Sequence, residues 1–241
     1  MRNLTIAFFA VILTGVACQK EKEDVLDEYA EDFIVFPEEL EEHDGLMLAV
    51  MNYINTLEVT GTPIIQEFAY AEFKEEKFVD VGIVRLNGNL LFKVPSNQYV
   101  SMPDDIGFKL KEGIRNKWQI SGGNSFQQIN QQVSMKMPGL VTFEEPPSEI
   151  NLSEPITLRI KNYPAQAEGV IWIVRDVDGK TIQKETKTAE ITISAADLGE
   201  LRSGAKSLIK VVAYASESLG SDGNKYLFLN ETADMMNVSF D

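Results

Sequence analysis

Short apolar segments separated by turn residues make up most of the chain from residue 46 onward. The clearest example covers residues 79–94, where two mainly apolar segments flank Asn87-Gly88-Asn89. Asn-Gly favours the positive φ angles of a two-residue hairpin turn, so we expect a β-hairpin here. Residues 46–54 are apolar at nearly every position, and the Thr-Gly-Thr-Pro break at 60–63 favours a buried strand over a short buried helix.

The spacing becomes regular after residue 140, and the segment 156–160 alternates apolar and polar residues as a strand with one solvent face does. The expected strands are 140–144, 156–162, 169–177, 181–185, 190–194, 207–215, 226–229 and 236–240, with one helical turn at 195–198. This density of strands is typical of an immunoglobulin-like sandwich. Trp172 suits the centre of such a core, packed on aliphatic side chains because paired cysteines are absent.

Further strands are expected at 68–73, 117–123 and 126–135, and Met137-Pro138-Gly139 has the composition of a hinge. We therefore predict an all-β protein with two β-sandwich domains in tandem. The first domain covers residues 46–138. The second covers residues 139–241 and is expected to be immunoglobulin- or fibronectin-III-like.

The first eighteen residues have the layout of an export signal. Met1-Arg2-Asn3 carries one positive charge, and residues 4–13 form an uncharged apolar run. That run is well short of the ~20 residues that a membrane-spanning helix needs. Gly15 and Ala17 then precede Cys18, the only cysteine of the chain. A lone cysteine in an exported protein has no internal disulfide partner, which favours another role for its thiol.

This segment resembles a bacterial lipoprotein signal. The resemblance implies that a peptidase removes residues 1–17 and that the Cys18 thiol carries diacylglycerol, so that the lipid holds the protein in the membrane. Gly15 departs from the family pattern, which usually has Leu three residues before the cysteine. An ordinary signal peptide followed by a chance cysteine is the alternative.

Residues 18–45 form an acidic tether in the sequence. Twelve Asp and Glu residues face only Lys20 and Lys22, a net charge of −10 out of the −15 of the whole chain. Such charge density favours a solvated segment. An apolar run, residues 33–37, interrupts it, and we expect this run to dock on the first domain as an edge strand. The acidic balance argues against nucleic acid as a partner, because nucleic-acid binding needs clustered Lys and Arg.

Residues 19–24 (QKEKED) resemble the Lys- and acid-rich signals that send lipoproteins of the Bacteroidota to the cell surface; a generic charged linker is the alternative. The segments DGLMLAVMNYI, AYAEF, VDVGIVRLNGNLLF, NKWQISGG and ITISAADLGELRSG also resemble a group of Bacteroidota outer-membrane lipoproteins with paired β-sandwich domains. The resemblance covers most of residues 44–241. It implies a fold and an outer-membrane, lipid-anchored location at the cell surface or facing the periplasm, and it implies no activity.

The inventory of reactive side chains is small. His43 is the only histidine and Cys18 the only cysteine, so Ser-His-Asp, Cys-His and histidine-rich metal sites are excluded. Asp176-Val177-Asp178-Gly179 and residues 222–224 resemble the starts of calcium loops but lack the remaining ligands, and hairpin turns explain them. Carboxylates are the remaining candidate catalysts, and a glycosidase needs two of them facing each other across a cleft. We predict no enzyme, no cofactor and no metal.

Four aromatic residues around the irregular loop 96–113 are the candidate ligand-binding residues: Tyr99, Phe108, Trp118 and Phe126. Aromatic rings stack on sugar faces, although filling a core is the competing role. The leading hypothesis is a binding, adhesion or envelope-assembly module with an unknown protein or glycan partner. A glycan-binding module for polysaccharide capture, a fimbria-associated subunit and a carboxylate-based glycosidase or lyase are the alternatives.

Overall fold

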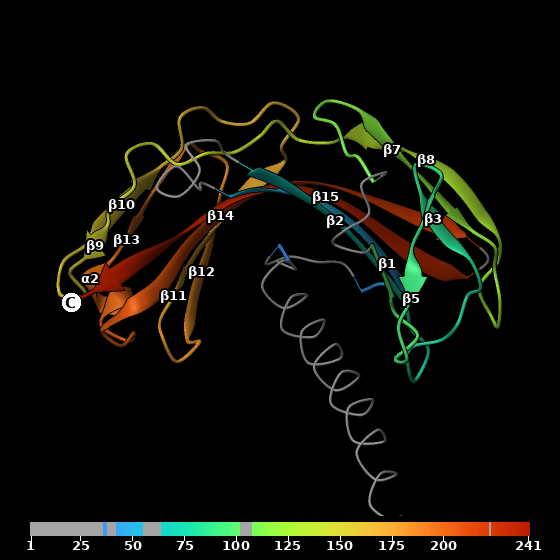
Figure 1. Ribbon diagram of the computed structural model, residues 1–241, viewed down its shortest axis with the longest axis horizontal. Coiled ribbons are helices and arrows are strands. Elements are labelled where there is room, and N and C mark those ends of the chain that lie inside the picture. Colours follow the sequence, from blue (N-terminus) through green and yellow to red (C-terminus); the bar gives the residue numbers. More distant parts are fainter. Residues whose placement is uncertain (1–35, 38–41, 55–63, 102–107, 222) are drawn as a thin grey trace, which may run out of the picture. The chain divides into compact units, whose positions relative to one another are not determined.

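The computed structural model describes residues 36–37, 42–54, 64–101, 108–221 and 223–241 (Figure 1). The signal-like segment, Cys18 and most of the acidic tether lie outside the described residues. Residues 33–35 of the apolar run lie outside them as well. The described residues from Pro37 to Asp241 belong to one compact unit. Nearly all of this unit is β-structure, and its one described helix is the single turn α2 (Ala195–Leu198) that the sequence predicts.

The described strands form three sheets. The largest has nine strands in the order β12-β11-β14-β15-β1-β2-β6-β5, with β9 also paired to β15. Its strands are β1 (Gly45–Ile54), β2 (Ile64–Phe73), β5 (Phe92–Lys93), β6 (Tyr99–Val100), β9 (Glu149–Ile150), β11 (Gly169–Arg175), β12 (Thr181–Thr186), β14 (Gly204–Ser221) and β15 (Asn224–Phe240). The second sheet is β4 (Asn89–Leu90), β3 (Val84–Leu86), β7 (Arg115–Ile120) and β8 (Ile129–Lys136), in that order. The third pairs β10 (Ile156–Arg159) with β13 (Glu190–Ile193).

The hairpin of β14 and β15 is the longest feature of the unit. The two strands pair without interruption from Ser207 opposite Val238 to Ser221 opposite Asn224, and Gly223 turns the chain with a φ of +87°. The sequence pattern predicts three shorter strands here, at 207–215, 226–229 and 236–240. The structure differs because the polar stretches 216–221 and 230–235 also pair: tertiary hydrogen bonding overrides their weak strand propensity.

Two hydrophobic cores lie on the same face of the long hairpin. The first core joins side chains of β1, β2 and β15, such as Met47 and Phe228, to Trp118 and other inward residues of the β4-β3-β7-β8 sheet. The second core joins side chains of β11, β14 and β15, such as Trp172 and Val211, to inward residues of the β10-β13 sheet. Figure 1 shows β3, β7 and β8 at one end of the long strands and β10 and β13 at the other.

Each core therefore has an outer layer of its own over a shared sheet, and the all-β sandwich class is confirmed. Tyr226 and Phe228 belong to the first core although they follow residue 139, whereas Val238 and Phe240 on the same strand belong to the second. The predicted boundary at residue 138 separates the outer layers but not the strands beneath them. Whether the two sandwiches behave as separate domains stays a prediction.

Several local predictions are confirmed. The 79–94 hairpin has Asn87 and Gly88 at its turn with φ angles of +51° and +87°, as a type I′ turn requires. Gly179, with a φ of +87°, lies in the turn between β11 and β12. Trp172 is fully buried in the second core, and its indole Nε1 donates to Thr186 Oγ1 at 3.0 Å.

Asp176 in that turn acts as a structural acceptor. Its carboxylate accepts backbone N–H bonds from Asp178, Lys180 and Arg202, each at 2.9 Å. Two of these bonds close the hairpin turn, and the third joins it to the segment that follows α2. A carboxylate with three backbone donors is satisfied within the turn, which explains the Asp-rich motif without calcium.

Candidate functional site

The four aromatic residues predicted to bind a ligand lie in the first core instead. Tyr99 is 1% exposed, Phe108 5%, Trp118 0% and Phe126 4%. The Phe126 ring packs edge-on against Phe73 and Tyr226, with centroids 5.5 and 6.1 Å away. Rings that fill a core offer no face to a sugar, so in this structure they perform the competing, structural role. Cys18, the lipidation candidate, lies outside the described residues.

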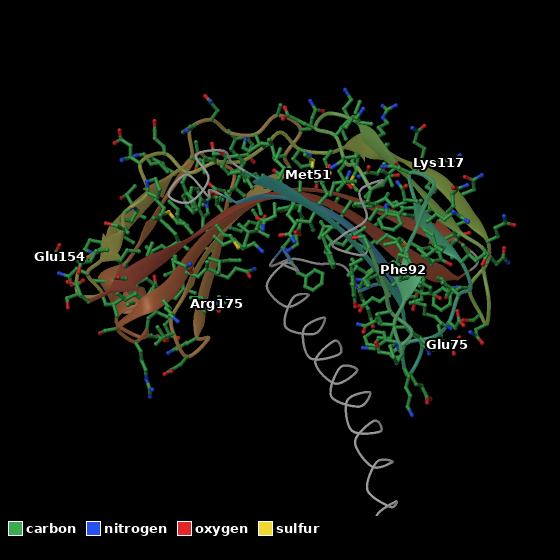
Figure 2. All side chains as sticks on the ribbon, viewed as in Figure 1. Met51, Glu75, Phe92, Lys117, Glu154 and Arg175 are labelled. Atoms are coloured by element: carbon green, nitrogen blue, oxygen red, sulfur yellow. The ribbon has the colours of Figure 1, made fainter. Side chains whose placement is uncertain are left out.

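The outer layer of the first sandwich carries a different candidate surface. In β3, β7 and β8 alternate side chains point into the core, as Leu86, Trp118 and Val133 do. The intervening side chains point the other way, because successive residues of a strand face opposite sides. They define what we call the cationic face: Arg85, Arg115, Lys117, Gln119, Asn130, Gln132 and Lys136. Figure 2 shows Lys117 on the outer side of this layer, away from the nine-stranded sheet.

The pairing of the strands fixes the arrangement of these residues. Arg85 on β3 lies opposite Gln119 on β7, and Gln119 lies opposite Asn130 on β8. Further along β7, Lys117 lies opposite Gln132 and Arg115 opposite Lys136. A register shift between Arg115 and Lys117 brings Lys136 opposite Arg115, where the Lys117–Gln132 register would have placed Ser134. Residues that are far apart in sequence thus form one continuous polar surface.

The charged side chains that these strands themselves contribute are all cationic, and one carboxylate from another strand, Glu217 of β14, reaches the edge of β8, where it accepts from Ser134 and Met135. The strands β3, β4, β7 and β8 contain no Asp or Glu, whereas they contribute Arg85, Arg115, Lys117 and Lys136. None of these four cations forms an ion pair with a described residue. Two of them bond to backbone carbonyl oxygens: Arg85 Nη1 donates to Gly88 at 3.1 Å and Arg115 Nε donates to Ser134 at 2.9 Å. Arg115 and Lys136 are directly opposite each other, an arrangement of like charges that costs stability.

A shallow hollow of about 170 Å³ lies at the Arg85 end of the cationic face. Its lining consists of Ile83, Arg85, Gln119, Ile120, Ser121, Gln128, Ile129 and Asn130. Ile83 is 52% exposed and gives the hollow an apolar wall. Its volume is below the roughly 300–1,000 Å³ of typical small-molecule pockets, so it fits one unit of a larger ligand better than a whole cofactor.

The sequence carries a signal for this surface in the distribution of its acidic residues. Residues 113–143 contain no Asp or Glu, in a chain with 37 of them. The same stretch holds eight Asn and Gln residues. The acidic tether dominates the charge of the whole chain, so this acid-free stretch is visible only when charge is mapped segment by segment.

Polar side chains on β15 bond to β7 of the first outer layer and to the crossover between the outer layers, residues 137–148. Asn116 Nδ2 donates to Asn230 Oδ1 at 2.8 Å, and Thr232 Oγ1 donates to the Gly139 carbonyl at 2.8 Å. Asp234 Oδ2 accepts from the Phe143 N–H at 2.9 Å. Burial raises the pKa of Asp234 to about 6, because the ionised form is poorly solvated there. These contacts have a structural role.

Two buried carboxyl groups with raised pKa values would be the natural pair for a glycosidase. Burial raises the pKa of both Glu231 and Asp234. For Glu231, the charge of Lys210 opposes this effect. Asp234 comes three positions after Glu231 on β15, an odd offset that places the two side chains on opposite faces of the sheet. This pair therefore cannot face one substrate across a cleft, as glycoside hydrolysis requires.

Within the described residues, no group of three or more His, Cys, Asp and Glu side chains is arranged to hold a metal ion. The described part of the chain also contains no helix that is both long and apolar enough to cross a bilayer.

Comparisons with known proteins give little. No protein-family model matches the chain, and a search of curated proteins finds no match. Among solved structures, the chain is similar to the N-terminal four Ig domains of Dscam1 isoform 8.4, with 11% identity and a TM-score of 0.21. The match covers 83% of this chain and 45% of that chain. A likeness this weak carries no inference about fold or partner.

Proposed function

We propose that this protein is a non-catalytic, lipid-anchored surface protein that binds its partner through the cationic face. The signal-like N-terminus and the acidic tether support the anchored location, and the inventory of reactive side chains supports a binding role. The observation that carries the proposal is the cationic face itself: four cations without acid partners gather on one layer of a strongly acidic chain.

The spacing of the cations makes them act together. Neighbouring strands lie about 5 Å apart, and residues two apart on one strand lie about 7 Å apart. Both distances are below the Debye length of about 8 Å at physiological ionic strength, so the fields of Arg115, Lys117 and Lys136 reinforce each other instead of being screened. Such a surface attracts an anionic partner and discriminates against cationic ones.

A charge-neutralised variant tests the binding surface. In the face variant, Arg85, Arg115, Lys117 and Lys136 are replaced by Gln. The matched control replaces Arg159, Lys180, Lys184 and Arg202, which pair with acids, so both variants lose the same formal charge. The detergent-solubilised full chains are applied to dextran sulfate resin and to neutral dextran resin, and the salt concentration at elution is measured.

We expect the wild type and the control variant to bind dextran sulfate and to elute at similar salt, whereas the face variant elutes at much lower salt. None of the three should be retained on neutral dextran. Equal behaviour of the two variants would show that retention follows net charge and would contradict a specific face.

The anchor is tested separately. Cys18→Ala, or growth with globomycin, should release the protein from the membrane fraction or leave its precursor unprocessed. Membrane fractionation that stays unchanged under both treatments would rule out lipidation at Cys18, whatever the cationic face binds.

A further inference from the structure

We infer that the hollow on the cationic face binds a carboxylate-bearing sugar unit of an acidic polysaccharide, and that the cations beyond it follow the rest of the polymer. This inference rests on the proposed function, because it names the ligand class of the same surface. It is argued from the side chains that line the hollow and from their order along β7.

Arg85 supplies the anion-binding group. Its guanidinium has five N–H donors in a planar fork, which matches a carboxylate through two parallel hydrogen bonds. The bond from Nη1 to the Gly88 carbonyl ties the side chain to the turn of its own hairpin. A guanidinium fixed in this way loses little further rotamer freedom when it binds, so the geometry favours a planar carboxylate over a diffuse ionic contact.

The amide groups beside Arg85 suit hydroxyl groups. Gln119 lies between Arg85 and Asn130 in the register, and Gln128 joins them in the lining of the hollow. Each amide offers both donors and an acceptor, and each sugar hydroxyl is likewise donor and acceptor. Phosphate and sulfate oxygens only accept, so they would leave the amide carbonyls unmatched. The exposed apolar wall at Ile83 suits the C–H face of a sugar ring.

The order of residues along β7 suits a polymer. Gln119 is at the hollow, Lys117 is next, and Arg115 is at the far end opposite Lys136. The four-residue separation from Gln119 to Arg115 spans about 13 Å along the strand. Anionic groups repeated along a chain could therefore contact Arg85 and the distal cations together, and several weak contacts on one polymer reinforce each other.

Single-stranded nucleic acid fits the same surface less well. Proteins that bind it combine cations with aromatic side chains on which the bases stack. The cationic face contains no aromatic residue, because Trp118 and the other rings of this region point into the core. Nucleic acid is therefore an outcome to be tested and not the expected ligand.

The test is affinity electrophoresis of the detergent-solubilised full chain through native gels. The gels contain polygalacturonate, dextran sulfate, neutral dextran or single-stranded DNA. We expect polygalacturonate to retard the wild type most strongly and neutral dextran to have no effect. Retardation by dextran sulfate or DNA without retardation by polygalacturonate would overturn the inference and leave the proposed function intact. Absence of retardation in every gel would contradict both.

Two substitutions distinguish specific binding in the hollow from general electrostatic attraction to the cationic face. Arg85→Lys keeps the charge but loses the planar fork, and Gln119→Leu removes the amide. Each substitution should weaken binding to polygalacturonate about tenfold, because each removes hydrogen bonds to the sugar unit. Binding to dextran sulfate should stay within about twofold of the wild type. Gln183→Leu, on β12 of the second sandwich and outside the cationic face, is the matched control and should bind as the wild type does.

Near-UV circular dichroism confirms that each variant is folded before its binding is measured. If Arg85→Lys and Gln119→Leu bind polygalacturonate as tightly as Gln183→Leu does, the hollow has no role in recognition and the inference is wrong.

Discussion

The outer layers of the two sandwiches do the same structural work but differ in how their solvent sides are arranged. Both layers cover the same face of the shared β14–β15 hairpin, and both point apolar side chains inward. On the solvent side of the second layer, Arg159 pairs with Glu190 at 3.0 Å and Thr157 bonds to Thr192 at 2.9 Å. On the first layer, Arg115 faces Lys136.

This difference separates what folding requires from what it does not. A layer needs an apolar inner side, and its solvent side is free to be neutral, paired or charged. Directly opposed unlike charges stabilise a strand pair slightly and like charges destabilise it. The second layer follows this rule, whereas the first layer departs from it. The binding role proposed for the cationic face would account for this departure.

The largest expected effect concerns the shared strands, and it tests whether the two sandwiches can be compared as independent parts. The chain has two tryptophans, Trp118 in the first core and Trp172 in the second. Replacing either by Ala should cost about 3–5 kcal/mol of unfolding free energy through the lost burial and the cavity left behind. The remaining tryptophan then reports on the other sandwich.

Because β14 and β15 contribute to both cores, we expect the fluorescence of the remaining tryptophan to shift its urea midpoint together with far-UV circular dichroism. A remaining tryptophan whose midpoint stays at the wild-type value would show that the sandwiches unfold separately despite the shared strands.

A smaller effect is expected where the crossover meets β15. Burial raises the pKa of Asp234 to about 6, so the folded state holds its proton more tightly than the unfolded state does. Stability from this group is therefore full below about pH 4 and declines as pH rises through 6. Asp234→Asn keeps an acceptor for the Phe143 N–H but does not titrate.

The difference in unfolding free energy between Asp234→Asn and wild type should grow in favour of the variant by about 1–3 kcal/mol from pH 4 to pH 7. Urea titrations at a series of pH values measure it. A difference that is constant over this range would show that Asp234 ionises normally in the folded state.

The smallest effects are expected from substitutions that exchange the charge patterns of the two outer layers. Lys136→Glu places an acid opposite Arg115 and should raise stability by about 0.2–1 kcal/mol while weakening retention on dextran sulfate. Glu190→Lys does the reverse on the second layer, placing like charges at Arg159, and should lower stability by a similar amount. Thermal denaturation at low salt gives both values. If Lys136→Glu lowers stability, the opposed cations Arg115 and Lys136 do not destabilise the first layer. The contrast drawn between the two outer layers would then be wrong.

Local patterns predicted much of the fold because short-range chemistry determines those parts. Asn87-Gly88 specifies its turn by backbone conformation, and the apolar run at 46–54 indicates a buried strand. The continuous hairpin was not predictable in the same way. Its polar stretches become strand only through partners such as β1, which pairs in parallel with β15 about 180 residues away.

The candidate site likewise has parts that local sequence patterns indicate and parts that depend on strand pairing. The alternation in Arg115–Ile120 places Trp118 on the side opposite Lys117 and Gln119, so the burial of Trp118 could have been inferred from the segment itself. The acid-free stretch was likewise visible in the sequence. What the sequence could not show is that Arg85 lies beside Gln119, because that contact depends on the pairing of β3 with β7.

The most direct test of the cationic face is lysine footprinting by acetylation and mass spectrometry, with and without polygalacturonate. Lys117 and Lys136 on the face are compared with Lys180 and Lys184 on the second sandwich, whose side chains are 51% and 41% exposed. We predict that the polymer protects Lys117 and Lys136 and leaves Lys180 and Lys184 unchanged. Equal protection of all four, or protection of the second pair alone, would contradict the assignment of the binding surface to the first outer layer.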